Sequence, residues 1–216
     1  MYQHRNSLIS LNTSAALCSV ALLVLWGASI PSVAAADTME SLSRQCKQLL
    51  YEKKKGEALK LLDRAIAAQP ANAGIYYLRA TVNLAKKDYE AMIKDLDKSI
   101  GIDPRNIDAY LLRAKANYMI SEMNVSNEFA NRYVKDLEAA LKLNPSHPAA
   151  NDARGVYLAS RSNYKDAIAA FSKAIAGDKT EYVYFEHRAM AYNALGDRKR
   201  ALADLQQATS LTLESY

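Results

Sequence analysis

The sequence predicts an all-α fold in which antiparallel helix hairpins form a superhelical array. Glycine and proline are scarce, with 7 and 5 residues among 216, and this composition favours helices over strands. Half of the residues are apolar and 24% are charged, as in globular proteins. The third observation is a set of small and large apolar residues that recurs at a fixed spacing, and this repeat decides the prediction.

Each predicted hairpin begins with a helix that has a small residue at one fixed position. These small residues are Cys46, Ala80, Ala114, Gly155 and Ala189, at spacings of 34, 34, 41 and 34. A large apolar residue recurs in the second helix, at Leu62, Leu96, Leu137, Phe171 and Leu205, and a proline closes three hairpins, at Pro70, Pro104 and Pro145. Small residues let two helices approach closely, and large ones fill the space between them. Because three independent positions share one period, the sequence predicts stacked hairpins, each packed against the next.

Taken in order, the repeat divides the chain into five hairpins. We predict them at about residues 39–72, 73–106, 107–147, 148–181 and 182–216. The most regular stretch is 155–178, in which Gly155 and Phe171 occupy the small and the large position. It therefore serves as the reference for the other four hairpins.

The third hairpin contains a seven-residue insertion around residues 121–127. Seven residues are close to two helical turns, so the insertion either lengthens both helices or forms a free loop. Asn124 also begins a glycosylation sequon, Asn124-Val125-Ser126, and is a candidate modification site.

This pattern resembles the tetratricopeptide repeat (TPR), a helix–turn–helix unit of 34 residues. The fourth hairpin matches the family at Gly155, Ala167, Phe171 and Ala174, and the fifth at Phe185, Ala189, Tyr192, Ala201 and Ala208. In the fourth hairpin, Asn151 replaces the usual aromatic residue and Lys179 the usual proline. The resemblance covers about residues 39–213 and implies a right-handed TPR solenoid whose first helices line a concave face.

The resemblance also implies that this concave face is the groove that binds a partner. Counting in register, its residues are Tyr77, Thr81, Leu84, Leu111, Lys115, Tyr118, Met119, Asp152, Val156, Glu186 and Met190. Aromatic and thioether side chains with isolated charges suit an extended segment or an amphipathic helix of another protein. The alternative is that part of this stripe only packs against neighbouring helices.

A charged pattern accompanies the small residues. Arginine precedes four of them, at Arg79, Arg113, Arg154 and Arg188, and aspartate precedes three of the large residues, at Asp95, Asp136 and Asp204. The fourth hairpin has Ala170 in place of the aspartate. We predict ion pairs within the hairpins, Arg79–Asp95, Arg113–Asp136 and Arg188–Asp204, each worth about 0–1 kcal/mol if exposed.

The turns inside the hairpins are rich in cations. They carry Lys53, Lys54, Lys55, Lys86, Lys87, Arg161, Lys165, Arg198, Lys199 and Arg200. Cations at the start of a helix oppose its dipole, so helix stability does not explain them. One interpretation is a basic edge that contacts an anionic surface, such as lipid headgroups or an acidic partner. The other is that lysine is simply common in solvated turns.

Residues 1–36 have the pattern of a secretory signal. A weakly positive start precedes an apolar run at residues 15–30, and small residues at 32–36 provide a cleavage site, most simply after Ala36. We therefore expect export to the periplasm or outside the cell, and the alternative is an uncleaved membrane anchor. Without this segment the net charge falls from +5 to +4, because Arg5 is its one lysine or arginine, and so mild an excess does not imply nucleic acid.

No set of residues in the remaining chain has the spacing of a catalytic, cofactor or metal site. It holds two histidines, His147 and His187, in different hairpins, and one cysteine, Cys46, which fits a buried packing position. The sequence therefore predicts a non-catalytic scaffold that binds other proteins. The alternative is a membrane-anchored assembly or adaptor factor. An uncapped last hairpin also suggests self-association.

Overall fold

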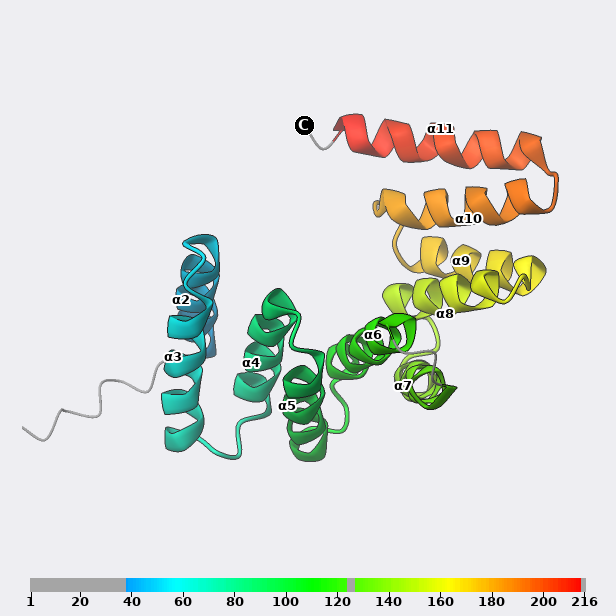
Figure 1. Ribbon diagram of the computed structural model, residues 1–216. Helices are drawn as coiled ribbons and strands as arrows, with labels where there is room; N and C mark the ends of the chain where they lie inside the picture. The colour runs from blue at the N-terminus through cyan, green and yellow to red at the C-terminus, as the bar shows by residue number, and fades with distance from the viewer. Residues whose placement is uncertain (1–37, 124–126, 215–216) are drawn as a thin grey trace, which may run out of the picture. The chain divides into compact units, whose positions relative to one another are not determined.

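The computed structural model describes residues 38–123 and 127–214, and within them it contains ten helices and no strand (Figure 1). The helices are α2 (Met39–Tyr51), α3 (Lys55–Ala68), α4 (Ala73–Lys86), α5 (Tyr89–Ile102), α6 (Ile107–Met123), α7 (Asn127–Leu143), α8 (Pro148–Ser160), α9 (Tyr164–Gly177), α10 (Tyr182–Ala194) and α11 (Arg198–Glu214). The predicted signal, residues 1–36, lies outside the described residues.

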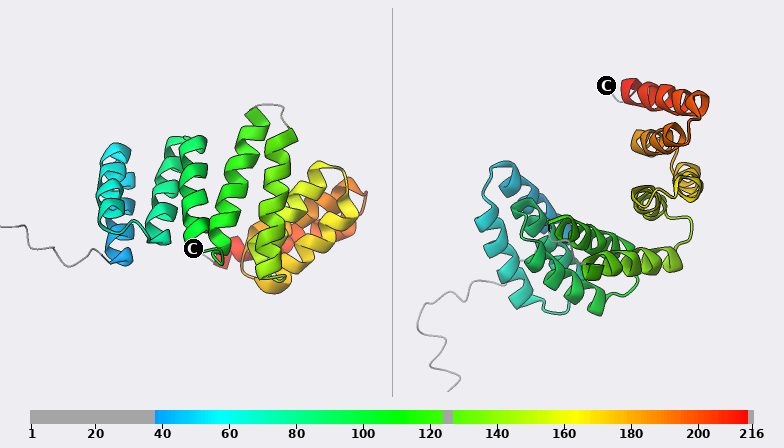
Figure 2. Two further views of the ribbon diagram at one scale, coloured as in Figure 1. Left: turned by 90° about the horizontal axis from the view of Figure 1, so that it is seen from below. Right: turned by 45° about the vertical axis from the view of Figure 1, so that its right-hand side comes forward.

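The ten helices form five successive hairpins, α2–α3, α4–α5, α6–α7, α8–α9 and α10–α11 (Figure 2). The second helix of each hairpin packs against the first helix of the next one. The predicted all-α solenoid of stacked hairpins is therefore confirmed. Each hairpin buries its apolar face against its neighbours, as expected for an array in which only adjacent units touch.

The recurring small and large residues form the core of this array. The five small residues are all buried, and Leu62, Leu96, Leu137 and Phe171 are at most 4% exposed. Leu205 occupies the same position in the last hairpin but is 46% exposed. The difference arises because α11 is the last described helix, so no following helix of the described residues covers its outer face.

Gly155 is required by its contact with Phe171. A Cβ atom built on Gly155 would lie 2.4 Å from a ring carbon of Phe171, closer than any real contact. The other hairpins combine alanine or cysteine with leucine at these two positions. In the fourth hairpin, therefore, the side chain of the first helix is smaller and that of the second helix is larger than in the other hairpins, and glycine faces the phenylalanine ring.

The insertion lengthens the two helices of the third hairpin. α6 and α7 have 17 residues each, whereas the helices of the first, second and fourth hairpins have 13 or 14. Of the two predicted alternatives, lengthening of both helices is thus confirmed within the described residues. Residues 124–126, which include the Asn124 sequon, lie outside the described residues.

A residue in the left-handed conformation follows the first helix in four of the hairpins. These residues are Lys53, Lys87, Ser162 and Gly196, with φ of 60°, 61°, 60° and 80°. The conformation lets a backbone N–H return to the end of the preceding helix, and glycine adopts it without steric cost. Three of these four turns therefore carry a side chain at a position that suits glycine.

Candidate functional site

Four of the predicted groove residues are half-buried and pack against the core. Tyr77 and Leu84 contact the cluster around Ala80 and Met92, while Leu111 and Tyr118 contact the cluster around Ala114. Burial, with a contribution from Asp108, raises the pKa of Tyr77. These four side chains join neighbouring helices, as the structural alternative to partner binding predicts.

Tyr118 also belongs to an aromatic seam between the third and fourth hairpins. Its ring centroid lies 5.7 Å from that of Tyr133, which lies 5.7 Å from that of Tyr157. The Tyr133 hydroxyl donates to the backbone oxygen of Ala153 at 2.9 Å. The seam thus holds α7 against α8 directly after the lengthened hairpin.

The other predicted groove residues differ in exposure. Lys115, Glu186 and Met190 are exposed, and Met190 is 69% exposed. Thr81 and Met119 are half-buried, and the Thr81 hydroxyl donates to the backbone oxygen of Leu78 at 2.7 Å. Partner binding by these residues stays a prediction.

An apolar pocket lies between α8, α9 and α10. Its volume is about 460 Å³, and it includes two predicted groove residues, Val156 and Met190. The other lining residues are Ala159, Ser160, Tyr164, Phe171, His187, Ala191 and Ala194. Ser160 and His187 are polar groups in an otherwise largely apolar lining, a combination that suits an apolar ligand group with a defined orientation.

One wall of this pocket is fixed by a contact that the sequence did not indicate. His187 Nδ1 on α10 lies 2.8 Å from Asp152 Oδ1 on α8. This hydrogen bond raises the pKa of His187, while burial lowers it, and the neighbouring Glu186 adds a smaller upward shift. Asp152, predicted to face a partner, is therefore engaged within the chain, and the two residues belong to different hairpins at positions that do not recur.

All three predicted arginine–aspartate pairs are confirmed. The shortest distances between the guanidinium nitrogens and the carboxylate oxygens are 2.5 Å for Arg79–Asp95, 2.6 Å for Arg113–Asp136 and 2.8 Å for Arg188–Asp204. The three aspartates are at most 7% exposed, so each pair is largely withdrawn from water. Such pairs carry more weight than surface ion pairs, because removing one partner leaves a buried charge.

Each of these arginines also reaches back to the preceding hairpin, which the sequence analysis did not predict. Arg79 Nη1 donates to Asp63 at 2.7 Å, and Arg113 Nη1 donates to Asp97 at 2.6 Å. Arg188 Nη1 donates to the hydroxyl of Ser172 at 3.0 Å. The partner lies 16 residues before the arginine each time, and this constant spacing in the sequence could have indicated the contacts between hairpins. We call this set of contacts the arginine ladder.

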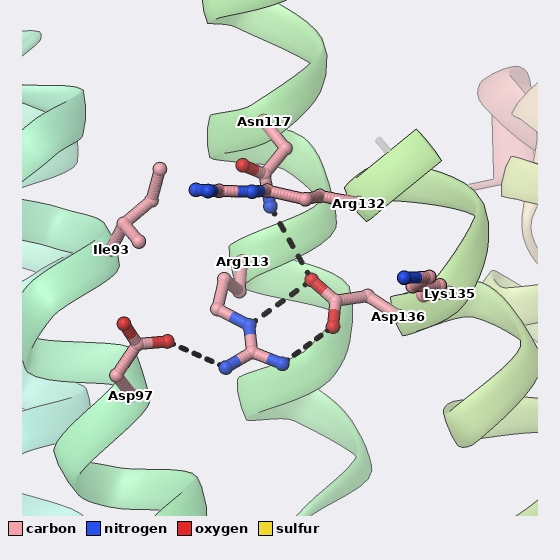
Figure 3. Close-up of a pocket in the computed structure, with 7 residues that line it drawn as sticks. All are labelled: Ile93, Asp97, Arg113, Asn117, Arg132, Lys135 and Asp136. Carbon is pink, nitrogen blue, oxygen red and sulfur yellow. Dashed lines mark hydrogen bonds and ion pairs between the residues drawn. The ribbon is translucent and has the colours of Figure 1, made fainter. Parts of the chain in front are cut away.

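Figure 3 shows the ladder at the third hairpin. The Arg113 guanidinium lies between Asp97 on α5 and Asp136 on α7, and the Asn117 amide also donates to Asp136. Burial raises the pKa of Asp136, and Arg113 opposes that shift. A cavity of about 330 Å³ adjoins the pair and is also lined by Ile93, Arg132 and Lys135. Asn117 Oδ1 is buried there and has no hydrogen-bond partner within residues 38–123 and 127–214.

Arg154 is the exception to the ladder. It occupies the same position in the fourth hairpin but is exposed, and within residues 38–123 and 127–214 it forms no ion pair or hydrogen bond. Its own hairpin supplies Ala170 instead of aspartate. The pattern of residues had identified this substitution, and the structure shows that no other residue in the described ranges takes the place of the aspartate.

The cations of the predicted basic edge are nearly all exposed at the turns, but several have partners. Lys54 pairs with Glu52 at 2.8 Å and Arg200 with Asp197 at 2.5 Å. The Lys55 ammonium donates to the backbone oxygen of Ala85 at 2.5 Å, which links the first two hairpins. The remaining seven residues are Lys53, Lys86, Lys87, Arg161, Lys165, Arg198 and Lys199. Binding of an anionic surface by this edge stays a prediction.

The described residues hold no group of three or more His, Cys, Asp or Glu side chains that could bind a metal ion. Cys46 is 1% exposed, and burial raises the pKa of its thiol, as fits a packing residue. None of the helices in the described ranges is long and apolar enough to cross a membrane.

Family models of the tetratricopeptide repeat match residues 49–107, 134–181 and 184–214. The matches together span more than half of the chain, and the chain belongs to the TPR family. TPR proteins generally bind other proteins or peptides. No curated protein sequence matches the chain significantly.

Several solved structures share this fold at low sequence identity. TTC0263, a thermophilic TPR protein of Thermus thermophilus, is 20% identical with a TM-score of 0.67, over 80% of this chain and 91% of that one. MamA is 19% identical with a TM-score of 0.64, over 79% of this chain and 95% of that one. YrrB, described as a TPR protein with an unusual peptide-binding site, is 19% identical with a TM-score of 0.56, over 82% and 93%. These similarities concern the fold.

Proposed function

We propose that the chain is a non-catalytic scaffold that binds a segment of another protein at the apolar pocket between α8 and α10. The observation that carries this proposal is the pocket itself, about 460 Å³ in volume and lined mainly by apolar side chains. Met190 lines it and is 69% exposed, so a large apolar side chain is available at the surface. Membership of a family that generally binds proteins or peptides supports the same function.

The lining indicates what the partner segment carries. A bulky apolar side chain fits the cavity, and the flexible thioether of Met190 adapts to its shape. Glu186 is exposed on the same helix, four residues before Met190, and favours a basic residue beside the apolar one. Both an extended segment and an amphipathic helix present such a pair of side chains.

The proposed place of action is the cell envelope or the exterior, and it rests on the sequence of residues 1–36. N-terminal sequencing of the mature protein tests it, because cleavage after Ala36 gives a chain that starts at Asp37. Retention of the segment would favour the alternative, a membrane-anchored adaptor whose basic turns face an anionic surface.

The binding proposal is tested by affinity capture with two matched variants. Met190→Glu places a charge at the pocket, whereas Leu202→Glu makes the same change on the exposed face of α11, where Leu202 is 58% exposed. We expect wild type and Leu202→Glu to capture the same proteins, and Met190→Glu to lose them, with capture quantified by mass spectrometry. Equal capture by all three proteins would remove the pocket as the binding site.

A further inference from the structure

Among the residues that the structure describes, Arg154 lacks all three kinds of partner that hold the other arginines of the ladder. Arg79, Arg113 and Arg188 each bind an aspartate of their own hairpin and a side chain 16 residues earlier. The Cζ atom of each arginine also lies 5.7–5.9 Å from the ring centroid of an aromatic residue three positions before it in the sequence. At the corresponding places around Arg154 the chain has Ala170, Glu138 and Asn151, and none of them forms a bond to Arg154.

A cavity adjoins Arg154 on the side where the fourth hairpin has Ala170 in place of an aspartate. Its volume is about 260 Å³, and it is lined by Asn151, Arg154, Leu158, Asp166, Ala169, Ala170 and Lys173. Ala170 and Arg154 therefore border the same open space, at the two positions where the other hairpins place a carboxylate against a guanidinium. The third hairpin has a cavity of about 330 Å³ at the equivalent positions, and Asp136 supplies a carboxylate to its lining. In the fourth hairpin the corresponding position is Ala170, so the arginine faces the cavity without that carboxylate.

The charges around this cavity favour an anion. Arg154 and Lys173 are cations of the lining, and Asp166 is its one carboxylate within the described ranges. Asp166 Oδ2 accepts a hydrogen bond from the Asn163 amide at 2.7 Å, so it is already engaged at the start of α9. A guanidinium that is free to bind two oxygens at once is a strong and geometrically selective partner for a carboxylate.

We propose that this cavity is a carboxylate-binding site, in which Arg154 and Lys173 hold a carboxylate that comes from outside the chain. The ligand takes the place that Asp95, Asp136 and Asp204 occupy in the other hairpins. The site shares no lining residue with the apolar pocket between α8 and α10, so it does not depend on the proposed function of that pocket. The carboxylate belongs either to a small organic acid or to an acidic side chain of another protein.

The test uses the purified protein, labelled with ¹⁵N, and two probes: succinate as a small carboxylate and tetraglutamate as an acidic peptide. NMR follows the Nε–Hε signal of Arg154 and the backbone amides of Ala170 and Lys173, with sodium chloride at equal ionic strength as the control. We expect a saturable shift with at least one probe and none with chloride. Response to both probes, or to succinate alone, identifies a small-acid site, and response to tetraglutamate alone identifies an acidic protein segment.

The decisive variant is Ala170→Asp, which restores the internal carboxylate. We expect the new carboxylate to pair with Arg154 and to compete with the probe. Probe binding should then weaken at least about tenfold, as the loss of one charged hydrogen-bonded contact does. Ala176→Asp is the matched control, because it adds the same charge at an exposed position of α9 that does not line the cavity.

Arg154→Gln provides a second test if Ala170→Asp fails to fold, since Arg154 is exposed and its loss leaves no buried charge. The amide shifts of Ala170 and Lys173 on adding probe should then disappear. The proposal is overturned if wild type shows no saturable shift with either probe. It is equally overturned if Arg154→Gln, or a folded Ala170→Asp, binds the probe as tightly as wild type and Ala176→Asp do.

Discussion

The third and fourth hairpins use the same arginine position in opposite ways. Arg113 lies between two carboxylates, Asp97 and Asp136, and is largely withdrawn from water, whereas Arg154 is exposed and unpaired within the described ranges. The backbones around the two residues are equivalent, since both arginines directly precede the small residue of a first helix. Arg113 is held by Asp136, Asp97 and the ring of Tyr110, and Arg154 has none of the three corresponding contacts within the described ranges.

The largest expected contrast comes from replacing each arginine with methionine, which keeps most of the length of the side chain. Arg113→Met leaves Asp136 buried without its cation, and we expect a loss of about 2–4 kcal/mol in the free energy of unfolding. Arg154→Met removes no partner, and we expect a change within about 0.5 kcal/mol. Urea denaturation followed by circular dichroism measures both. Similar losses for the two variants would contradict the distinction between a structural and an available arginine.

The second contrast concerns the small and large positions of the two hairpins. The third combines Ala114 with Leu137, and the fourth combines Gly155 with Phe171. Because a Cβ atom on Gly155 would lie 2.4 Å from the Phe171 ring, we expect Gly155→Ala to cost about 1–3 kcal/mol. Phe171→Leu alone leaves a void and costs about 1 kcal/mol.

The double variant Gly155→Ala/Phe171→Leu recreates the combination of the third hairpin. We expect it to be more stable than the sum of the two single changes by more than about 1 kcal/mol, since the two sites are in contact. Additive losses in the same denaturation measurement would show that the two positions do not compensate each other.

These two contrasts also show what the sequence could predict. The Gly155–Phe171 relation and the Arg113–Asp136 pair depend on positions that recur, so the period of the repeat places them against each other before any coordinates are known. The His187–Asp152 contact joins two hairpins through positions that do not recur, and no pattern indicated it. The carboxylate site was visible in the sequence as Ala170, but its cavity depends on how side chains fill the space around Arg154, which spacing alone does not determine.

A smaller effect is expected in the turns. Lys87 has a φ of 61°, a conformation that costs an L-residue about 1–2 kcal/mol and glycine almost nothing. We expect Lys87→Gly to raise the free energy of unfolding by about 0.5–1 kcal/mol, net of the greater freedom of glycine in the unfolded chain. Lys94→Gly, an equal loss of charge inside α5, is the control and should cost about 1 kcal/mol. Destabilisation by both variants would mean that the Lys87 side chain contributes more than its backbone conformation costs.

The smallest expected effect is a pH dependence of stability that arises from the His187–Asp152 contact between the fourth and fifth hairpins. Asp152 raises the pKa of His187 in the folded protein, so the protonated histidine favours folding. This contribution is complete below the unfolded pKa, about 6.5, and is lost as the pH rises through the higher folded value. We expect the free energy of unfolding to fall by at most about 1 kcal/mol between about pH 6 and pH 8.5, because His187 is partly exposed. Asp152→Asn should reduce this fall while the carboxylates of the arginine ladder remain, and an unchanged pH dependence in that variant would assign it to another group.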